Sequence, residues 1–225
     1  MSRTIAIGDI HGCATALASL LDAIALQPGG TLVTMGDYVD RGMESQKVIE
    51  ILMELMGRTR LIPLMGNHEV MMLQALKDRQ AFNFWLQHGG QQTLQSYGGK
   101  LEKIPQQHLI FLQHCLKHWE NEDHFFVHAN YLANQSLEET PDEILFWQHM
   151  KLAFPLPHIN GKKAWVGHTP QDGGNIQDLG HVALIDTHCY DDGFLSAVDV
   201  DSGDFWQVKM DGSMRVLEPA EDHNG

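Results

Sequence analysis

Three short polar segments of the chain carry residue types that bind divalent metals, hold phosphate and transfer protons. They read Gly8-Asp9-Ile10-His11-Gly12, Gly36-Asp37-Tyr38-Val39-Asp40-Arg41-Gly42 and Gly66-Asn67-His68-Glu69. Carboxylates and imidazoles are common ligands of divalent cations, and the planar guanidinium of an arginine binds phosphate through two N–H groups. Any one segment is also ordinary turn or helix-capping chemistry. The prediction of a site therefore depends on whether the chain brings the three together.

The elements around the segments predict that they do meet. An apolar run precedes each segment and an amphipathic helix pattern follows it. Asp37 follows Asp9 by 28 residues and Asn67 follows Asp37 by 30, about one βαβ unit in each case. Right-handed crossovers place successive parallel strands in one sheet. The three segments then leave that sheet at its carboxyl edge, where open α/β sheets bind ligands.

Two later apolar runs each deliver one more histidine. Residues 125–127 read as a strand that ends at His128, and residues 164–166 as a strand that ends at His168. The stretch 74–117 reads as mainly helical, with a break at His88-Gly89-Gly90, and 182–185 and 195–200 read as further strands. A threonine N-cap, a proline and a glutamate at the right spacing predict a helix that starts at Thr140.

Two carboxylates, one amide oxygen and three imidazoles form the candidate ligand set: Asp9, Asp37, Asn67, His11, His128 and His168. Without a thiolate, such a set suits Mn²⁺, Fe or Zn²⁺ better than calcium or copper(I). Six ligands suit two ions that share a carboxylate, the arrangement that stabilises both oxygens of a hydrolytic displacement. Arg41 adds phosphate recognition. His68 is placed to donate a proton, and Asp40 to fix its tautomer.

Each candidate also has a purely structural interpretation. Asp9 and Asp37 are good helix N-caps, and Asn67 can stabilise a turn. A lone histidine after a buried strand, such as His128, is more often a hydrogen-bonded core residue than a ligand. His168 precedes Thr-Pro, which is turn chemistry. The shared sheet edge favours the metal site over these alternatives.

Composition narrows the class of protein. The 225 residues fit one domain, predicted over 1–217, with a polar tail at 218–225. A formal charge of −14 argues against binding nucleic acid through its backbone phosphates. Three unpaired cysteines indicate neither a disulfide framework nor a cysteine zinc site. The chain shows no signal-peptide region and no apolar segment of membrane-spanning length, so we expect a cytoplasmic protein that does not contact membranes.

Together the three segments, in this order and spacing, resemble the signature blocks of the phosphoprotein phosphatase family, the metal-dependent serine/threonine phosphatases. The similarity is greatest to the small bacterial and phage members. It extends through His128-Ala129, Gly167-His168-Thr169-Pro170 and Ile185-Asp186-Thr187, and so covers most of the chain.

The resemblance implies an α/β fold, the calcineurin-like metallophosphoesterase αββα sandwich with mixed sheets flanked by helices. It also implies two divalent ions, Mn²⁺ ahead of Fe or Zn²⁺, with Asp37 as their bridge. The first ion is held by Asp9, His11 and Asp37, and the second by Asp37, Asn67, His128 and His168. A metal-bound water or hydroxide attacks phosphorus, His68 protonates the leaving oxygen with support from Asp40, and Arg41 and Asn67 bind the substrate.

The chain departs from the family pattern at two places. Many relatives carry a second phosphate-binding arginine on a helix in a Trp-Asn-Arg-like context. Here the run is Phe146-Trp147-Gln148-His149-Met150-Lys151, so His149 or Lys151 is the candidate replacement, on opposite faces of the predicted helix. Relatives often have glycine where this chain has His188. With Asp191 and Asp192 nearby, His188 is expected to contact substrate or, in the interpretation we favour, to lie at the surface.

The function that the resemblance implies is hydrolysis of phosphoprotein or phosphopeptide monoesters by a serine/threonine phosphatase. One alternative on the same fold is a hydrolase of diadenosine tetraphosphate or other nucleotides. Members of its symmetric type tend to have alanine where Asp40 stands, so Asp40 favours the phosphatase, but it does not argue against asymmetric cleavage. A non-catalytic binding module is a second alternative, which the intact ligand set argues against. A doubly wound nucleotide-binding protein is a third, but the sequence has neither a G-x-G-x-x-G nor a Walker motif.

Overall fold

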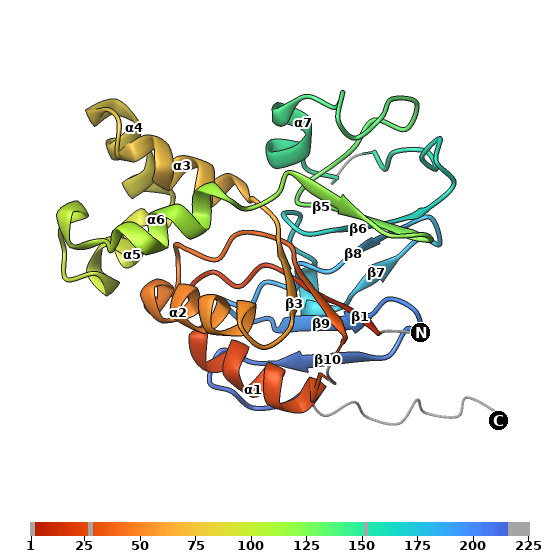
Figure 1. The fold of residues 1–225 in the computed structure, drawn as a ribbon, viewed down its shortest axis with the longest axis horizontal. Helices are drawn as coiled ribbons and strands as arrows, with labels where there is room; N and C mark the ends of the chain where they lie inside the picture. The colour runs from red at the N-terminus through yellow and green to blue at the C-terminus, as the bar shows by residue number, and fades with distance from the viewer. Residues whose placement is uncertain (1–2, 27–28, 151–152, 216–225) are drawn as a thin grey trace.

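The computed structural model describes residues 3–26, 29–150 and 153–215. Two mixed sheets lie face to face (Figure 1). In spatial order, the first sheet consists of β10 (Phe205–Val208), β9 (Leu195–Asp199), β1 (Thr4–Ile7), β2 (Thr31–Thr34) and β3 (Arg60–Pro63). The second consists of β4 (His118–Glu120), β5 (His124–Val127), β6 (Lys163–Val166), β8 (Val182–Leu184) and β7 (Gln177–Asp178).

The register of the first sheet explains why the three polar segments meet. β1, β2 and β3 are parallel neighbours, with Thr4 opposite Thr31 and Thr31 opposite Arg60. The three strands therefore end level with one another, and the segments that follow them emerge side by side. β5 and β6 are likewise parallel neighbours in the second sheet and end level at Val127 and Val166. The predicted convergence of the segments at one edge is confirmed.

The alternation of side chains along the strands builds the layers. On β1, Ile5 and Ile7 face the helices outside the first sheet, while Ala6 faces the second sheet. On β5, Phe126 belongs to the layer between the sheets, while Phe125 and Val127 face outward. Apolar side chains thus fill three layers, one between the sheets and one on each outer face. The predicted αββα sandwich is confirmed.

Helices cover the outer face of the first sheet and extend beyond it at one end of the molecule (Figure 1). The covering helices are α1 (Ala14–Ile24) and α2 (Ser45–Met56). The remainder run as α3 (Asn67–Ala75), α4 (Arg79–Trp85), the π-helical turn η1 (Leu86–Gly90), α5 (Gln91–Ser96), the 3₁₀ turn η2 (Leu101–Lys103) and α6 (Gln106–Gln113). The predicted break at His88-Gly89-Gly90 is confirmed. The helical path is kinked within η1, where His88 and Gly89 have non-helical backbone angles and Gly89 has φ +106°, and α5 follows.

The helix predicted from Thr140 forms, but it begins two residues later and ends before His149. It is α7 (Asp142–Trp147), a short helix outside the second sheet. The hydroxyl of Thr140 donates to the carbonyl oxygen of Ser136 in the preceding turn, so it does not cap the helix. Because α7 ends at Trp147, His149 lies in the irregular chain after it rather than on a helical face. Lys151 and the predicted tail lie outside the described residues.

Some elements gave no sequence signal. These are β4, β7, β10 and the 3₁₀ turn η3 (Asp172–Gly174). Their strands lie at or next to the edges of the sheets, where fewer positions are buried on both faces and an apolar run is not required. Among the described residues, no helix is both long and apolar enough to cross a membrane.

Candidate metal centre

Backbone carbonyls orient two of the predicted ligand histidines. Nδ1 of His11 lies 3.0 Å from the carbonyl oxygen of Val39, and Nδ1 of His128 lies 2.7 Å from that of Met35. A histidine that donates Nδ1–H in this way keeps Nε2 unprotonated, with its lone pair available to a metal. Burial lowers the pKa of both imidazoles, so they are neutral at pH 7. Both imidazoles are therefore neutral and oriented so that Nε2 could bind a metal.

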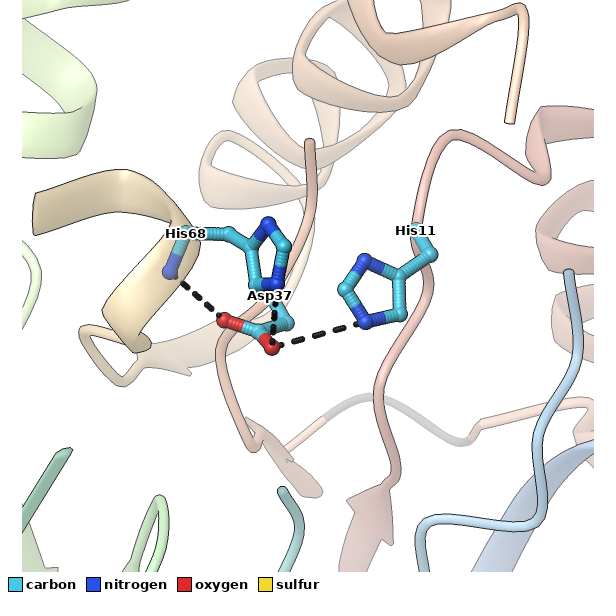
Figure 2. A group of neighbouring side chains, drawn as sticks. All are labelled: His11, Asp37 and His68. Atoms are coloured by element: carbon cyan, nitrogen blue, oxygen red, sulfur yellow. Dashed lines mark hydrogen bonds and ion pairs between the residues drawn. The ribbon is translucent and has the colours of Figure 1, made fainter. Parts of the chain in front are cut away.

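Asp37 lies at the centre of the group and is 2% exposed. Its Oδ2 is 3.4 Å from Nε2 of His11 and 3.9 Å from Nε2 of His68 (Figure 2). Its Oδ1 faces the other side, 3.5 Å from Nε2 of His128. The two carboxylate oxygens thus point at different imidazoles, as a carboxylate shared between two ions must.

Among the described residues, three groups of side chains bring their donor atoms within 4.8 Å of one another: Asp37 belongs to two of them, and the third is His188, Asp191 and Asp192. The two groups that share Asp37 lie at the centre. One contains His11 and His68, the other His128 and His168. Asn67 joins the second set, since its Oδ1 lies 3.1 Å from Nε2 of His128. Burial and the neighbouring His128 lower the pKa of His168 to about 3, which keeps this imidazole neutral as well.

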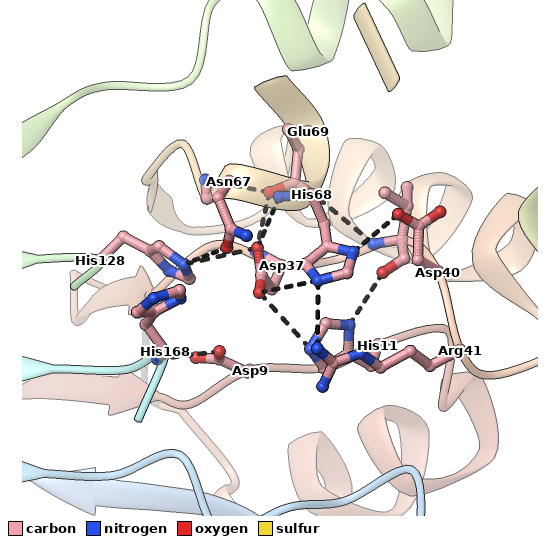
Figure 3. A network of polar contacts seen from close by, with 12 residues as sticks. Asp9, His11, Asp37, Asp40, Arg41, Asn67, His68, Glu69, His128 and His168 are labelled. Atoms are coloured by element: carbon pink, nitrogen blue, oxygen red, sulfur yellow. Dashed lines mark hydrogen bonds and ion pairs between the residues drawn. The ribbon is translucent and has the colours of Figure 1, made fainter. Parts of the chain in front are cut away.

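Asp9 supplies the clearest sign that the centre fits cations. Its Oδ2 accepts the backbone N–H of His168 at 2.9 Å (Figure 3). Its Oδ1 is buried without a hydrogen-bond partner. Burial and the charges of Asp186 and Asp37 raise the pKa of Asp9 well above its usual value. A buried carboxylate among others, with one oxygen unpaired, calls for positive charge. The donor set of oxygens and imidazoles fits the divalent ions named above.

His68 and Asp40, which the sequence predicts as a proton-transfer pair, lie in contact. Nδ1 of His68 lies 2.7 Å from Oδ2 of Asp40, so Nε2 faces Asp37 (Figure 3). Burial lowers the pKa of His68, but the charge of Asp37 and the hydrogen bond to Asp40 outweigh it, and the net pKa is raised. A raised pKa keeps the imidazole protonated nearer neutral pH, as a general acid requires.

The residues that hold Asp40 were missed as functional. Nε1 of Trp85 donates to both carboxylate oxygens at 2.9 Å, and the Thr93 hydroxyl donates to Oδ1 at 2.7 Å. The sequence predicted no functional role for Trp85 or Thr93. Both partners come from the helical insertion α4–α5, and no spacing along the chain relates them to Asp40. Burial raises the pKa of Asp40, and these donors together with His68 oppose that rise.

Glu69 is a second residue whose role was missed. Its carboxylate accepts backbone N–H groups from Asp37 at 2.7 Å, Tyr38 at 2.8 Å and Gly66 at 3.0 Å (Figure 3). It therefore ties the second polar segment to the third. The available signal was its position three residues after Gly66, where a glutamate closes a helix cap. A Cβ on Gly66 would lie 2.2 Å from Oδ1 of Asp37, so only glycine fits there.

Backbone strain is concentrated at this edge of the sheets. Of the seven non-glycine residues with positive φ among those described, six lie in the polar loops and one, Ala25, ends α1. The six are His11, Asp37, Asp40, Arg41, His168 and His188. Left-handed conformations cost an L-residue of order 1–3 kcal/mol and cluster at functional sites. The concentration of strain at this edge agrees with a functional site there.

A cavity of about 280 Å³ opens over the centre. Arg41 and His149 line it, as predicted for phosphate contacts, together with Asp186, Phe84, His88 and Trp147. The exposed ring of His149 stacks on His168, with centroids 4.1 Å apart. His188 is half-buried, and its Nε2 lies 2.7 Å from the Tyr190 hydroxyl. Asp191 and Asp192 are exposed.

Comparison with known proteins assigns the family. The model of the calcineurin-like phosphoesterases matches residues 2–200. The chain is 31% identical to serine/threonine-protein phosphatase 2 of Escherichia coli K12 over 206 residues, which covers 84% of this chain and 89% of that protein. It is 40% identical to a symmetrical bis(5'-nucleosyl)-tetraphosphatase of Pseudomonas fluorescens, over 73 residues that cover 32% of this chain and 25% of that protein. The chain belongs to the calcineurin-like phosphoesterase family.

The fold agrees with solved structures. A cold-active protein-tyrosine phosphatase of the psychrophile Shewanella sp. superposes with a TM-score of 0.68 at 17% identity, over 97% of this chain and 81% of that one. At this identity the similarity shows the fold alone. The family match, with which this fold agrees, shows that the protein is a metallophosphoesterase. This is the class of hydrolase that the resemblance implied.

Proposed function

We propose that the protein is a phosphoprotein serine/threonine phosphatase that depends on two divalent ions. One observation carries the proposal. His68, hydrogen-bonded to Asp40, directs Nε2 into the cavity, where Nη2 of Arg41 lies 3.3 Å from it. A proton donor and a phosphate-binding cation therefore lie side by side, next to the ligand group centred on Asp37. This is the arrangement needed to hold a phosphate monoester and protonate its leaving oxygen.

Two groups of ligands that share Asp37 would each hold one ion. Asp9, His11 and Asp37 would hold one ion, and Asp37, Asn67, His128 and His168 the other, with Mn²⁺ as the proposed metal. When bound, the ions supply Lewis-acid stabilisation of phosphoryl oxygens and lower the pKa of water.

The remaining residues act on the substrate. The guanidinium of Arg41 neutralises charge on the phosphoryl group and, with Asn67, fixes its orientation. His68 gives its Nε2 proton to the departing alkoxide, which is a poor leaving group unless protonated. Asp40 stabilises the imidazolium before the transfer and keeps the ring in the productive tautomer.

The leaving group distinguishes this function from nucleotide hydrolysis. Serine and threonine alkoxides need protonation far more than a nucleotide phosphate does, so a buried His68–Asp40 pair favours a phosphomonoester. The bacterial phosphatase relative aligns over most of both chains, whereas the tetraphosphatase aligns over a quarter of its own length. Nucleotide hydrolysis is the second candidate.

An activity screen tests the proposal. Metal-loaded protein is offered phosphoserine, phosphothreonine and phosphotyrosine peptides and dinucleoside polyphosphates at equal concentration. Release of orthophosphate from the serine and threonine peptides at the highest kcat/KM is the expected result. Faster cleavage of the dinucleoside polyphosphates would assign the protein to the second candidate. Metal binding without turnover of any of these substrates would indicate a binding module.

We also propose His149 as a second phosphate contact. It lines the cavity and stacks on His168, although it follows α7 instead of lying on it. A His149→Arg variant, which introduces a permanent charge, is expected to lower KM for a phosphopeptide above neutral pH, with kcat changed less. KM values that follow the wild type from about pH 6 to 8.5 would remove His149 from this role.

A further inference from the structure

The guanidinium of Arg41 is held without an acidic partner. Among the described residues, none of the ion pairs within 4.0 Å includes Arg41, and its polar side-chain contact is Nη2 to Nε2 of His68 at 3.3 Å. Its backbone is fixed by a hydrogen bond to the carbonyl oxygen of Gly89 at 3.1 Å. A flexible arginine loses considerable rotamer freedom when it is held in one place. A contact other than an ion pair is therefore needed to restrict the guanidinium to the position in which it can bind phosphate.

Tyr190 makes that contact. The Cζ of Arg41 lies 4.4 Å from the centre of the Tyr190 ring, within the range of a cation–π interaction. The same ring meets His11 edge to face, with centroids 5.0 Å apart and planes at 86°. One half-buried aromatic ring therefore touches both the phosphate-binding cation and a proposed metal ligand. A planar ring supports the guanidinium while leaving its N–H groups available for an anion.

The loop that carries Tyr190 is itself braced. The Tyr190 hydroxyl lies 2.7 Å from Nε2 of His188, and the two rings pack edge to face. Across the neck of the loop, the N–H of Phe194 donates to the carbonyl oxygen of Thr187 at 2.8 Å. Between His188 and Tyr190, the side chain of Cys189 is buried in the core. Tyr190 therefore occupies a fixed place relative to Arg41.

We propose that Tyr190 is a positioning residue for phosphate binding, and that His188 holds Tyr190 in place. The ring keeps the Arg41 guanidinium where the phosphoryl group arrives, so that less freedom is lost on binding. This inference rests on the proposed function of the cavity as a phosphomonoesterase site. It assigns the His188 departure a role that is neither direct substrate contact nor plain surface exposure.

A double-mutant cycle tests the proposal with p-nitrophenyl phosphate as substrate. Tyr190→Leu is expected to raise KM by roughly 3–10-fold, the size of a partly exposed cation–π contact, with a smaller change in kcat. In an Arg41→Ala background the same substitution should change KM by less than about 2-fold, because the ring then has no guanidinium to hold. Equal effects in both backgrounds would overturn the proposal.

Two conservative variants refine the assignment. Tyr190→Phe keeps the ring and should stay within about 3-fold of wild-type KM, since only the hydroxyl contact with His188 is lost. His188→Ala removes the same contact and should raise KM by up to about 3-fold; a KM equal to that of the wild type would mean that His188 does not hold Tyr190. Phe205→Leu, an exposed aromatic substitution on the edge strand β10, is the matched control and should change nothing. A Tyr190→Phe variant as impaired as Tyr190→Leu would contradict a role for the ring.

Metal content and orthophosphate affinity separate the possible failures. If Tyr190 acts mainly through His11, Tyr190→Leu will lose bound metal, and the role assigned through Arg41 is wrong. Calorimetric binding of orthophosphate to metal-loaded protein needs no turnover, and Tyr190→Leu should weaken it by the same 3–10-fold. Wild-type protein that binds orthophosphate but hydrolyses no monoester would refute the proposed function while this binding test still decides the role of Tyr190.

Discussion

Carboxylates near the two ends of strand β1 lie in opposite electrostatic surroundings. One of them is Asp199, the last residue of the neighbouring strand β9, opposite Ile5 of β1. At the amino-terminal end, Asp199 receives the Nε–H of Arg3 and two backbone N–H groups of the turn that follows it. At the carboxyl end, Asp9 and Asp37 are buried together with Asp186, and Oδ1 of Asp9 has no partner. Groups of the protein itself supply the hydrogen-bond partners of Asp199. The group at the carboxyl end leaves Oδ1 of Asp9 without such a partner and would be completed by bound cations.

The pKa directions express the same difference. Burial raises the pKa of Asp199, but the hydrogen bond from Arg3 and the backbone N–H groups outweigh it, and its pKa falls below the usual value. Burial and two neighbouring carboxylates raise the pKa of Asp9. The charge of Asp199 thus stabilises the folded protein, whereas the charge of Asp9 destabilises the metal-free folded protein. Four substitutions test this contrast.

Asp37→Asn should have the largest effect, because it removes the charge shared by both ligand groups while keeping the shape of the side chain. Metal affinity should fall at both positions by more than the ~10–100-fold that loss of an outer partner costs. Activity at metal concentrations that saturate the wild type should drop at least ~10⁴-fold, the upper end for loss of a general acid. Elemental analysis and kinetics measure the two effects. Asp22→Asn, on the exposed face of α1, is the control; full metal occupancy in Asp37→Asn would end its bridging role.

His68→Asn tests a site residue whose acidic partner is already satisfied. Because Asp40 keeps its bonds from Trp85 and Thr93, the fold and the metals should survive. The kcat for an alkyl phosphate should fall by ~10²–10⁴, the usual share of a general acid. For p-nitrophenyl phosphate the loss should be smaller, because p-nitrophenolate leaves without a proton. Equal losses on the two substrates, at unchanged metal content, would mean that His68 does not protonate the leaving group.

The sequence predicted the inner centre better than its supports. Asp9, Asp37, Asn67, His128 and His168 each follow directly from a strand, so the register of the sheets decides where they meet. The hydrophobic pattern that identifies the strands therefore also predicts the centre. Glycines that flank the ligands add a second local signal, because strained turns need them.

The supports could not be predicted because they depend on tertiary packing. Trp85 and Thr93 reach Asp40 from an insertion with no fixed spacing to it. Tyr190 reaches Arg41 from a loop about 150 residues further along the chain. The N-cap of α7 was wrongly predicted because the Thr140 hydroxyl donates a competing hydrogen bond in the preceding turn, a choice between local partners that the sequence leaves open.

The effect of Asp9→Asn on the free energy of unfolding should have opposite signs in metal-free and metal-loaded protein. In metal-free protein it removes one of several crowded buried charges and an unpaired oxygen, so the free energy of unfolding should rise by about 1–2 kcal/mol, the usual penalty of an unsatisfied buried group. In metal-loaded protein the variant should be the less stable of the two, because it binds the ions more weakly. Thermal unfolding with and without a chelator measures both. A variant less stable than wild type in both states would show that Asp9 carries no such cost.

Asp199→Asn should have the smallest effect, and one of opposite sign. Because the pKa of Asp199 is lowered in the folded protein, its contribution is present above the unfolded value of ~3.9 and is lost as the pH falls through the folded value. Urea unfolding at pH 7 should show a loss of about 1 kcal/mol, typical of one charge-assisted hydrogen bond partly open to solvent. The gap between variant and wild type should begin to close below pH ~3.9, and it should vanish below the lower pKa of the folded state, where the wild-type side chain is neutral as well. Activity should not change, since the residue lies at the far end of β1 from the metal centre. A gap that persists unchanged at low pH would attribute the loss to packing rather than charge, and the contrast between the two ends of the strand would no longer be electrostatic.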